Sequence, residues 1–222
     1  MRDMHCHILP GVDDGSRNLQ ESLEMLEAAK RAGITSIVCT PHCRDPWFDY
    51  DAMWDAFDLL NAHAGGFPLS MGFEVNHVKL MQLGMAWVEY VKFDQTNEFL
   101  LELSDGCTAY DFREYERTIF ELQGMGLEVI IAHPERYAAI QKDIGIAENL
   151  VKMGCRLQAS SNCENKGPFN VRTQTAKKLF ARGLYDYVCS DAHRVPAYKD
   201  YERVCRKYNF MNESGFTGKA KF

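Results

Sequence analysis

Histidines and acidic residues recur along this chain at the points where short apolar segments end. His5 and His7 stand two positions apart after the first such segment, and Asp191 and His193 repeat this spacing near the end of the chain. Residues two apart in a β-strand point to the same face, so each pair can address a single point. The complete set of candidate ligands is His5, His7, Asp14, His42, Glu74, Glu102, His133, Asp191 and His193.

These side chains predict divalent metals. Buried without a cation, four carboxylates would repel one another and lose their hydration. At roughly four to six ligands for each ion, nine protein groups together with waters supply two or three metals. Nitrogen and oxygen ligands without a thiolate suit manganese, iron, zinc or magnesium, and they argue against a structural zinc site.

The elements that must position these residues alternate along the chain. Strands are expected at 2–7, 35–40, 69–74, 98–103, 128–133, 156–160 and 186–190. Helices are expected near 19–32, 51–64, 77–91, 111–124, 143–153, 171–182 and 197–208. Asn18 and Glu21 have the spacing of a capping box at the start of the first helix, and Gly33 follows its end. Seven β-α units in a row predict an α/β fold with a parallel sheet, either wound open or closed as a barrel.

A seven-stranded barrel of the TIM type fits better than a Rossmann sheet, because His-Cys-His stands where a glycine-rich phosphate loop would follow the first strand. Barrel enzymes carry their sites at the C-terminal ends of the strands. Every predicted strand except the sixth brings a candidate ligand there, and the sixth brings Ser-Ser-Asn at 160–162. Asp14 lies in a loop whose glycines, Gly11 and Gly15, let it fold back over the barrel mouth. The remaining histidines, His63 and His77, are expected to be solvated.

Composition and net charge further limit the class of protein. The chain has 222 residues, 46% of them hydrophobic and 25% charged, which is typical of one globular domain over 1–222. The net charge is −6 and no run of Lys or Arg suggests a nucleic-acid partner, although a local basic patch stays open. Without a signal peptide or an apolar stretch of about 20 residues, we expect a cytoplasmic protein with no membrane insertion. The tail at 212–222 is expected to be loosely ordered.

The eight cysteines are expected to be reduced thiols packed in the interior, because no Cys-x-x-Cys pair appears. Cys107 and Arg113 have the Cys-x5-Arg spacing of cysteine-based tyrosine phosphatases. Such a match is common by chance, and the intervening residues contain no glycine that would let backbone amides cradle a phosphate. A cysteine mechanism is therefore disfavoured.

Six short motifs, in this order, resemble a known family. They are Asp-Met-His-Cys-His at 3–7, Gly-Val-Asp-Asp-Gly at 11–15, Thr-Pro-His at 40–42, Gly-Phe-Glu at 72–74, Ala-His-Pro-Glu-Arg-Tyr at 132–137 and Ser-Asp-Ala-His at 190–193. The set resembles the polymerase-and-histidinol-phosphatase (PHP) superfamily. More narrowly, it is similar to the bacterial tyrosine-protein phosphatases of capsule and exopolysaccharide operons, the CpsB/YwqE type. The resemblance covers roughly residues 1–210.

This resemblance implies a distorted TIM-like (β/α)7 barrel of the PHP type, a manganese-favouring trinuclear site and a cytoplasmic enzyme. The implied substrate is phosphotyrosine on the tail of a partner tyrosine kinase that controls polysaccharide export. The family's metal ligands carry over onto the nine positions above. Its phosphate-binding arginine carries over onto Arg136, with Arg44 as a second candidate. The chain departs from the family pattern at its C-terminus and over 76–96, so homo-oligomer contacts stay open.

The expected mechanism is attack on phosphorus by a metal-activated hydroxide. Arg136 would bind the phosphoryl oxygens, Asp191 would hold metal, and His193 or a bound water would serve as the general acid. One alternative is a small-molecule phosphatase acting on histidinol phosphate or a sugar phosphate, and a nuclease-type member is disfavoured by the acidic balance. An alternative from another class is a regulatory binding module that keeps the fold without its chemistry.

Overall fold

The computed structural model describes residues 1–210, and the predicted loose tail at 212–222 lies outside this range. Its strands are β1 (Arg2–Cys6), β2 (Ser36–Cys39), β3 (His42–Cys43), β4 (Leu69–Met71), β5 (Glu74–Asn76), β6 (Glu98–Glu102), β7 (Glu128–Ala132), β8 (Arg156–Ser160) and β9 (Tyr187–Cys189). The larger helices are α1 (Leu19–Arg31), α2 (Tyr50–His63), α5 (Phe112–Gly124), α7 (Gly145–Lys152), α8 (Val171–Ala181) and α9 (Ala197–Tyr208). Shorter ones are α3 (His77–Leu83), η1 (Met85–Trp87), α4 (Val88–Val91), η2 (Pro134–Arg136) and α6 (Ala138–Lys142).

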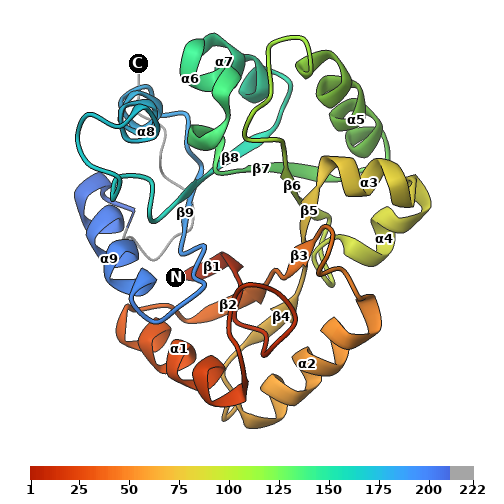
Figure 1. Cartoon of the computed structure of the whole chain (residues 1–222), viewed down its shortest axis with the longest axis vertical. Coiled ribbons are helices and arrows are strands. Elements are labelled where there is room, and N and C mark those ends of the chain that lie inside the picture. The colour runs from red at the N-terminus through yellow and green to blue at the C-terminus, as the bar shows by residue number, and fades with distance from the viewer. Residues whose placement is uncertain (211–222) are drawn as a thin grey trace.

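The strands lie in the middle of the molecule and the helices surround them (Figure 1). Two parallel sheets run β1-β2-β4 and β3-β5-β6-β7-β8-β9. The first strand also meets the end of the last, since Cys6 and Ala192 form an isolated parallel bridge. Asp191 N donates to His5 O at 2.8 Å and His7 N to Ala192 O at 3.0 Å beside this bridge. The predicted α/β fold with parallel pairing is thus confirmed.

Two predicted strands differ from the observed ones near their C-terminal ends, where the chain leaves one sheet and pairs again in the other. The segment at 35–40 ends as β2, and Thr40-Pro41 separates it from the two residues of β3. The segment at 69–74 likewise stops at β4 before Gly72-Phe73 leads into β5. Backbone bonds span both breaks, because Gly72 N donates to Cys39 O at 2.9 Å and Glu74 N to Pro41 O at 3.1 Å. His42 and Glu74 therefore lie in the short strands β3 and β5 that follow the breaks. The two chain segments stay hydrogen-bonded to each other across both breaks.

The helix predicted near 77–91 was also wrong in detail, because Gly84 adopts φ +83° and divides it into α3, η1 and α4. Glycine occupies this left-handed region without a steric penalty. The start of α1 was predicted correctly: Asn18 Oδ1 accepts from Glu21 N at 3.0 Å, as in an N-cap. Gly33, at φ +81°, follows the end of that helix as expected.

Alternate residues of the central strands pack on opposite faces of the sheet. Phe99 and Leu101 of β6 belong to the large apolar cluster that the helices cover. Leu100 between them, with Ile130 of β7, belongs to a smaller cluster on the other face. This smaller cluster consists of Met4, Val38, Phe93, Leu100, Ile130, Ala132 and Cys189. Both faces of the strands are buried, as expected for a parallel sheet, and polar side chains collect at one end.

Among the described residues no helix is both long and apolar enough to cross a membrane. All eight cysteines are buried, so their predicted packing in the interior is confirmed, and none is paired in a disulfide.

Candidate metal centre

The nine predicted ligands converge on one end of the strands. Their positions are His5 in β1, His7 after it, Asp14 before α1, His42 in β3, Glu74 in β5, Glu102 in β6, His133 after β7, and Asp191 and His193 after β9. Seven of the nine are buried, whereas the side chains of Asp14 and His193 stay 45% and 31% exposed. The site is therefore buried except at Asp14 and His193, where it is open to solvent.

Glu74 lies at the centre of this group. Its Oε2 is 3.4 Å from Nε2 of both His5 and His7, and 2.6 Å from Nδ1 of His42. Its Oε1 lies 2.7 Å from His133 Nε2. One carboxylate thus faces four imidazoles from three strands, and its two oxygens contact different rings. Glu74 and these histidines could together hold metal ions.

The remaining acids complete two flanks of the centre. Asp14 Oδ1 lies 3.2 Å from His42 Nε2 and 3.3 Å from His193 Nε2. Asp191 Oδ1 lies 3.7 Å from both His5 Nε2 and His193 Nδ1. Three groups have ligand atoms within 4.8 Å of one another: His7-Asp14-His42-His193, His5-His7-Glu74 and His42-Glu74-Glu102. These residues could hold a metal ion.

The buried polar atoms show whether a metal fits. His42 Nδ1 and Glu74 Oε2 are close, yet neither has a hydrogen bond of acceptable geometry, and His133 Nδ1 also lacks one. Such atoms are unfavourable in a protein interior unless something satisfies them. A cation accepts lone pairs from several directions and relieves this cost. The donor set, five imidazoles and four carboxylates without a thiolate, therefore fits divalent metals.

The charges of this centre are strongly coupled. Burial opposes protonation of His5, but the carboxylates of Glu74 and Asp191 outweigh it and raise the pKa of His5 to about 9. Burial and the neighbouring charge of Glu74 raise the pKa of Glu102 to about 7. Burial and the charge of Arg136 lower the pKa of His133 to about 3. Protons on these groups would compete with metals for the same lone pairs, so metal binding should release protons.

Outer residues that sequence reasoning missed hold the imidazoles in place. Asp13 Oδ2 accepts from His7 Nδ1 at 2.8 Å and from the backbone N of His42 at 3.1 Å. Gln158 Oε1 accepts from His5 Nδ1 at 3.0 Å. Such bonds fix the tautomer and leave the other ring nitrogen free for a metal. The sequence offered one indication of the role of Asp13, which is its position directly before the predicted ligand Asp14. Nothing in the sequence indicated a role for Gln158.

The loop before α1 folds back as predicted. Ser16 N donates to His7 O at 3.0 Å and Gly11 N donates to Ser16 O at 2.7 Å. A Cβ on Gly15 would meet His7 O at 2.1 Å, so only glycine allows this approach. The close contact brings Asp14 to the open side of the centre.

Two ligands have backbone conformations that L-residues rarely adopt. His133 has φ 31° and ψ 58°, and Asp191 has φ 47°. Left-handed backbone is unfavourable for side chains of this kind and is often found at functional sites. At these positions the chain turns sharply where β7 and β9 end, which directs both side chains toward the centre.

Arg136, the predicted phosphate-binding residue, lies beside the predicted metal ligand Asp191. Its Nη2 contacts Asp191 and lies 3.4 Å from Ser160 Oγ, which itself donates to Asp191 Oδ2 at 2.9 Å. Burial would lower the pKa of Arg136, but Asp191 and Glu135 raise it, so the guanidinium stays charged. Its Nε is buried without a hydrogen bond. A charged, incompletely satisfied guanidinium beside the centre is suited to bind an anion.

Arg44, the second predicted phosphate ligand, also reaches the centre. Its Nη1 donates to Glu102 Oε1 at 3.1 Å and its Nη2 lies 2.9 Å from His42 Nε2. It therefore contacts two predicted metal ligands. Residues 160–162, expected to bring no ligand, instead support Arg136 and Asp191 through Ser160.

The two remaining histidines differ. His63 is exposed as predicted, and its Nδ1 donates to Leu59 O at 2.8 Å. The prediction for His77 was wrong: it is buried, its Nε2 lies 2.9 Å from Thr118 Oγ1, and it packs edge-on against Tyr115. The cause is the packing of the first turn of α3 against Tyr115 and Thr118 of α5.

Cys107 has none of the features of a nucleophile. It is buried, and burial raises the pKa of its thiol, whereas catalytic cysteines have a lowered pKa. Arg113 lies on the exposed side of α5, with its guanidinium 5.6 Å from the Tyr110 ring. The Cys-x5-Arg spacing therefore forms no phosphate loop.

We accordingly expect Cys107→Ser to leave phosphatase activity within about twofold of the wild type, because the serine preserves the shape of a side chain without a chemical role. Initial rates on a phosphotyrosine peptide check this, with Cys155→Ser as a matched buried control. A loss of activity in Cys107→Ser alone would reinstate the cysteine mechanism.

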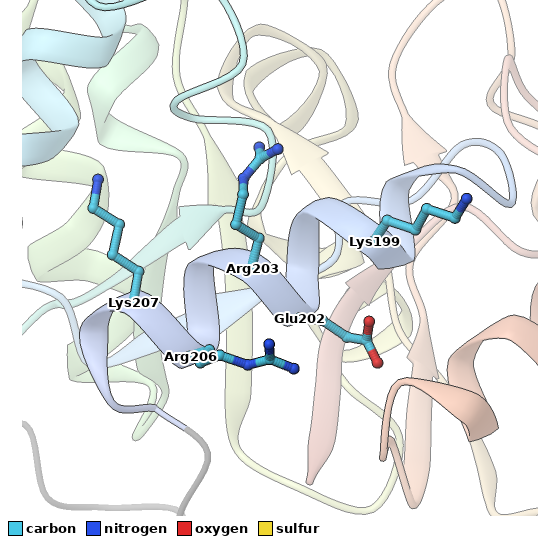
Figure 2. A pocket seen from close by; sticks show the side chains of 5 residues that line it. All are labelled: Lys199, Glu202, Arg203, Arg206 and Lys207. Atoms are coloured by element: carbon cyan, nitrogen blue, oxygen red, sulfur yellow. The ribbon is translucent and has the colours of Figure 1, made fainter.

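A separate hollow on the outer face of α9 is lined mainly by basic side chains and has no cluster of metal-binding residues. Figure 2 shows its lining side chains spread along one helix without converging: Lys199, Glu202, Arg203, Arg206 and Lys207. Arg203 pairs with Asp200 at 2.7 Å and Lys207 with Glu164 at 2.7 Å. This is the local basic patch that the composition left open, and its residues cannot perform the chemistry that the centre supports.

The fold and this centre together define a class: a parallel α/β protein whose strand ends gather histidine and acidic side chains that could hold metal ions. The chain belongs to the family described as capsular polysaccharide synthesis, CpsB/CapC, whose sequence profile matches residues 1–209. The family resemblance predicted from the motifs is thus confirmed.

Individual relatives agree with this assignment. The tyrosine-protein phosphatase YwqE of Bacillus subtilis (strain 168) is 32% identical over 203 residues, covering 88% of this chain and 78% of that protein. The tyrosine-protein phosphatase CpsB of Streptococcus agalactiae is 26% identical over 224 residues, covering 94% and 91%.

Solved structures agree with it as well. One described as YwqE from Bacillus subtilis and CpsB from Streptococcus pneumoniae, unique metal-dependent tyrosine phosphatases, matches with a TM-score of 0.80 at 28% identity, covering 98% of this chain and 89% of that one. A histidinol phosphate phosphatase from Lactococcus lactis, at 14% identity and a TM-score of 0.56, shares the fold, with 98% of this chain and 97% of that one covered.

Proposed function

We propose that this protein is a metal-dependent phosphatase that hydrolyses phosphotyrosine on a partner protein. The observation that carries the proposal is the convergence of nine side chains with nitrogen or oxygen donor atoms beside the half-buried guanidinium of Arg136. The relatives named as tyrosine-protein phosphatases, and the matching structure described as metal-dependent, support the same activity.

The finer architecture belongs to this proposal. We infer a distorted seven-stranded (β/α)7 barrel in which β2 and β3 count as one strand, as do β4 and β5. The parallel bridge between Cys6 and Ala192 supports closure between the first and last strands. A single domain over 1–222 is part of the same inference.

We propose two or three divalent metals, probed first with manganese, held by the nine ligands. Metals bound there lower the pKa of water toward neutrality and clamp phosphoryl oxygens. The chain's own residues bind and orient the substrate. Arg136 binds the phosphoryl oxygens and stabilises their charge, and His193, on the open side, is placed to donate a proton to the leaving oxygen. A tyrosyl oxygen has a pKa of about 10 and so leaves with little assistance.

The inferred partner is a bacterial tyrosine kinase of capsular or exopolysaccharide synthesis, met in the cytoplasm. The family description links the chain to capsular polysaccharide synthesis, and the composition gives no nucleic-acid stripe. Homo-oligomer formation is an open part of this inference.

A metal-dependent screen tests the proposal. We expect a chelator to abolish hydrolysis of a phosphotyrosine peptide and manganese to restore it, because the ligands cannot activate water alone. We also expect kcat/KM for the peptide to exceed that for histidinol phosphate by about tenfold or more.

A reversed preference would support the small-molecule phosphatase. A purified chain without bound metal that stays inert after manganese is added would favour the regulatory module. The presence of all nine ligands argues against that last alternative.

A further inference from the structure

Trp47 differs from the other two tryptophans in what it contacts. Trp54 packs on Tyr50 and Phe57, and Trp87 packs within the same aromatic group. The Trp47 indole instead stacks on the imidazole of His42, with ring centroids 5.4 Å apart and an interplanar angle of 27°. An apolar ring therefore stands directly beside the proposed metal centre.

A tight turn holds Trp47 there. Trp47 N donates to Arg44 O at 3.0 Å, and Phe48 N to the same oxygen at 3.1 Å. Phe48 anchors the turn by packing edge-on against Phe73 and Trp87. The turn thus directs its second aromatic ring to the core and leaves Trp47 at the site.

Arg44, the polar neighbour of Trp47, also holds the indole at this position. The Arg44 guanidinium carbon lies 5.0 Å from the centroid of the Trp47 ring, while Arg44 Nη1 donates to Glu102. A cation over an aromatic face favours a fixed orientation of both groups. Trp47 itself is only half-buried, so part of the indole faces solvent at the edge of the centre.

We propose that Trp47 is a specificity-determining residue that contacts the aryl ring of the substrate and selects aryl phosphates over alkyl phosphates. This inference rests on the proposed function and adds the feature that would separate a tyrosine phosphatase from a small-molecule phosphatase with the same ligands. A phosphoryl group bound at the centre would place the leaving group at the exposed edge of the centre, and Trp47 adjoins the centre beside His42. An indole at this position gives an aromatic ring a face or edge to pack against, which an alkyl chain uses less well.

Binding of two non-hydrolysable phosphonates to the manganese-loaded protein tests the proposal. Phenylphosphonate and methylphosphonate carry the same anionic group and differ in the ring, and calorimetry measures both without turnover. We expect Trp47→Leu, which keeps apolar bulk, to weaken phenylphosphonate binding by about tenfold and to leave methylphosphonate within about twofold. Trp47→Phe should retain most of the aryl preference.

Trp54→Ala is the control, because it removes a half-buried tryptophan that packs on Tyr50 and Phe57 and not on Phe48, which anchors the turn of Trp47. It should leave both affinities unchanged, even where it lowers the melting temperature. Equal losses for both phosphonates in Trp47→Leu would show that Trp47 only positions His42 or Arg44, and would overturn the proposal, as would no loss for either. Failure of the wild type to hydrolyse phosphotyrosine would refute the proposed function and still leave the phosphonate comparison readable.

Discussion

Replacing Glu74 by glutamine should abolish both metal binding and catalysis. The amide keeps the size of the side chain but removes the charge that four imidazoles face. It also places N–H donors where lone pairs are needed. We expect kcat/KM on a phosphotyrosine peptide to fall by about 10³-fold or more, which corresponds to about 4 kcal/mol of lost transition-state stabilisation.

Metal analysis of the purified Glu74→Gln variant separates this effect from misfolding. Bound manganese should fall together with activity. At neutral pH the variant should also be less stable than the wild type, because it loses the charge of Glu74. Burial would raise the pKa of Glu74, but His5 and His42 hold this pKa well below its usual range. A depressed folded-state pKa stabilises the protein above the unfolded pKa, and this stabilisation is lost as the pH falls.

Glu27→Gln is the matched control for this prediction, since Glu27 is 58% exposed on α1 and pairs only with Lys30 nearby. It should leave metal content, activity and melting temperature unchanged. A Glu74→Gln variant that retains its metal and works within tenfold of the wild type would show that Glu74 is not a ligand.

Much of this centre followed from the sequence, because ligands in parallel strands obey a simple rule. Strand ends of one sheet meet at one edge, so residues as distant as His5 and His193 could be placed together from spacing alone. The rule needs only the type and order of elements, which hydrophobic periodicity supplies. The rule held despite the break at the end of the strand predicted at 35–40 and the break within the one at 69–74, because backbone hydrogen bonds continue the pairing across both.

The supporting contacts could not be predicted in the same way. Gln158 reaches His5 through a bond that joins residues 153 positions apart, and an isolated glutamine in a strand has no distinguishing pattern. The left-handed backbone of His133 and Asp191 contradicts local preference, so only tertiary structure reveals it. His77 was misjudged for a related reason: its burial depends on contacts with Tyr115 and Thr118 of α5, which are distant in the sequence.

The charges of Arg136 and Asp191 connect the predicted metal centre with the binding of phosphate. Arg136 contacts Asp191, and this carboxylate is also a predicted metal ligand. A cation held by Asp191 would share the charge of this carboxylate, and the guanidinium beside it would then be available to another anion. The phosphoryl group of the substrate is the anion that the proposed reaction brings to this point.

Arg136→Lys should therefore lower kcat/KM by about 10²- to 10³-fold, or about 3 to 4 kcal/mol, while metal content stays at the wild-type level. Lysine preserves the positive charge, so the loss measures the planar fork that binds two oxygens at once. Arg117→Lys on α5, where the side chain is 82% exposed, is the matched control and should behave as the wild type. Loss of metal in Arg136→Lys would instead assign Arg136 to holding Asp191, because a residue that binds only phosphate has no influence on the occupancy of the centre.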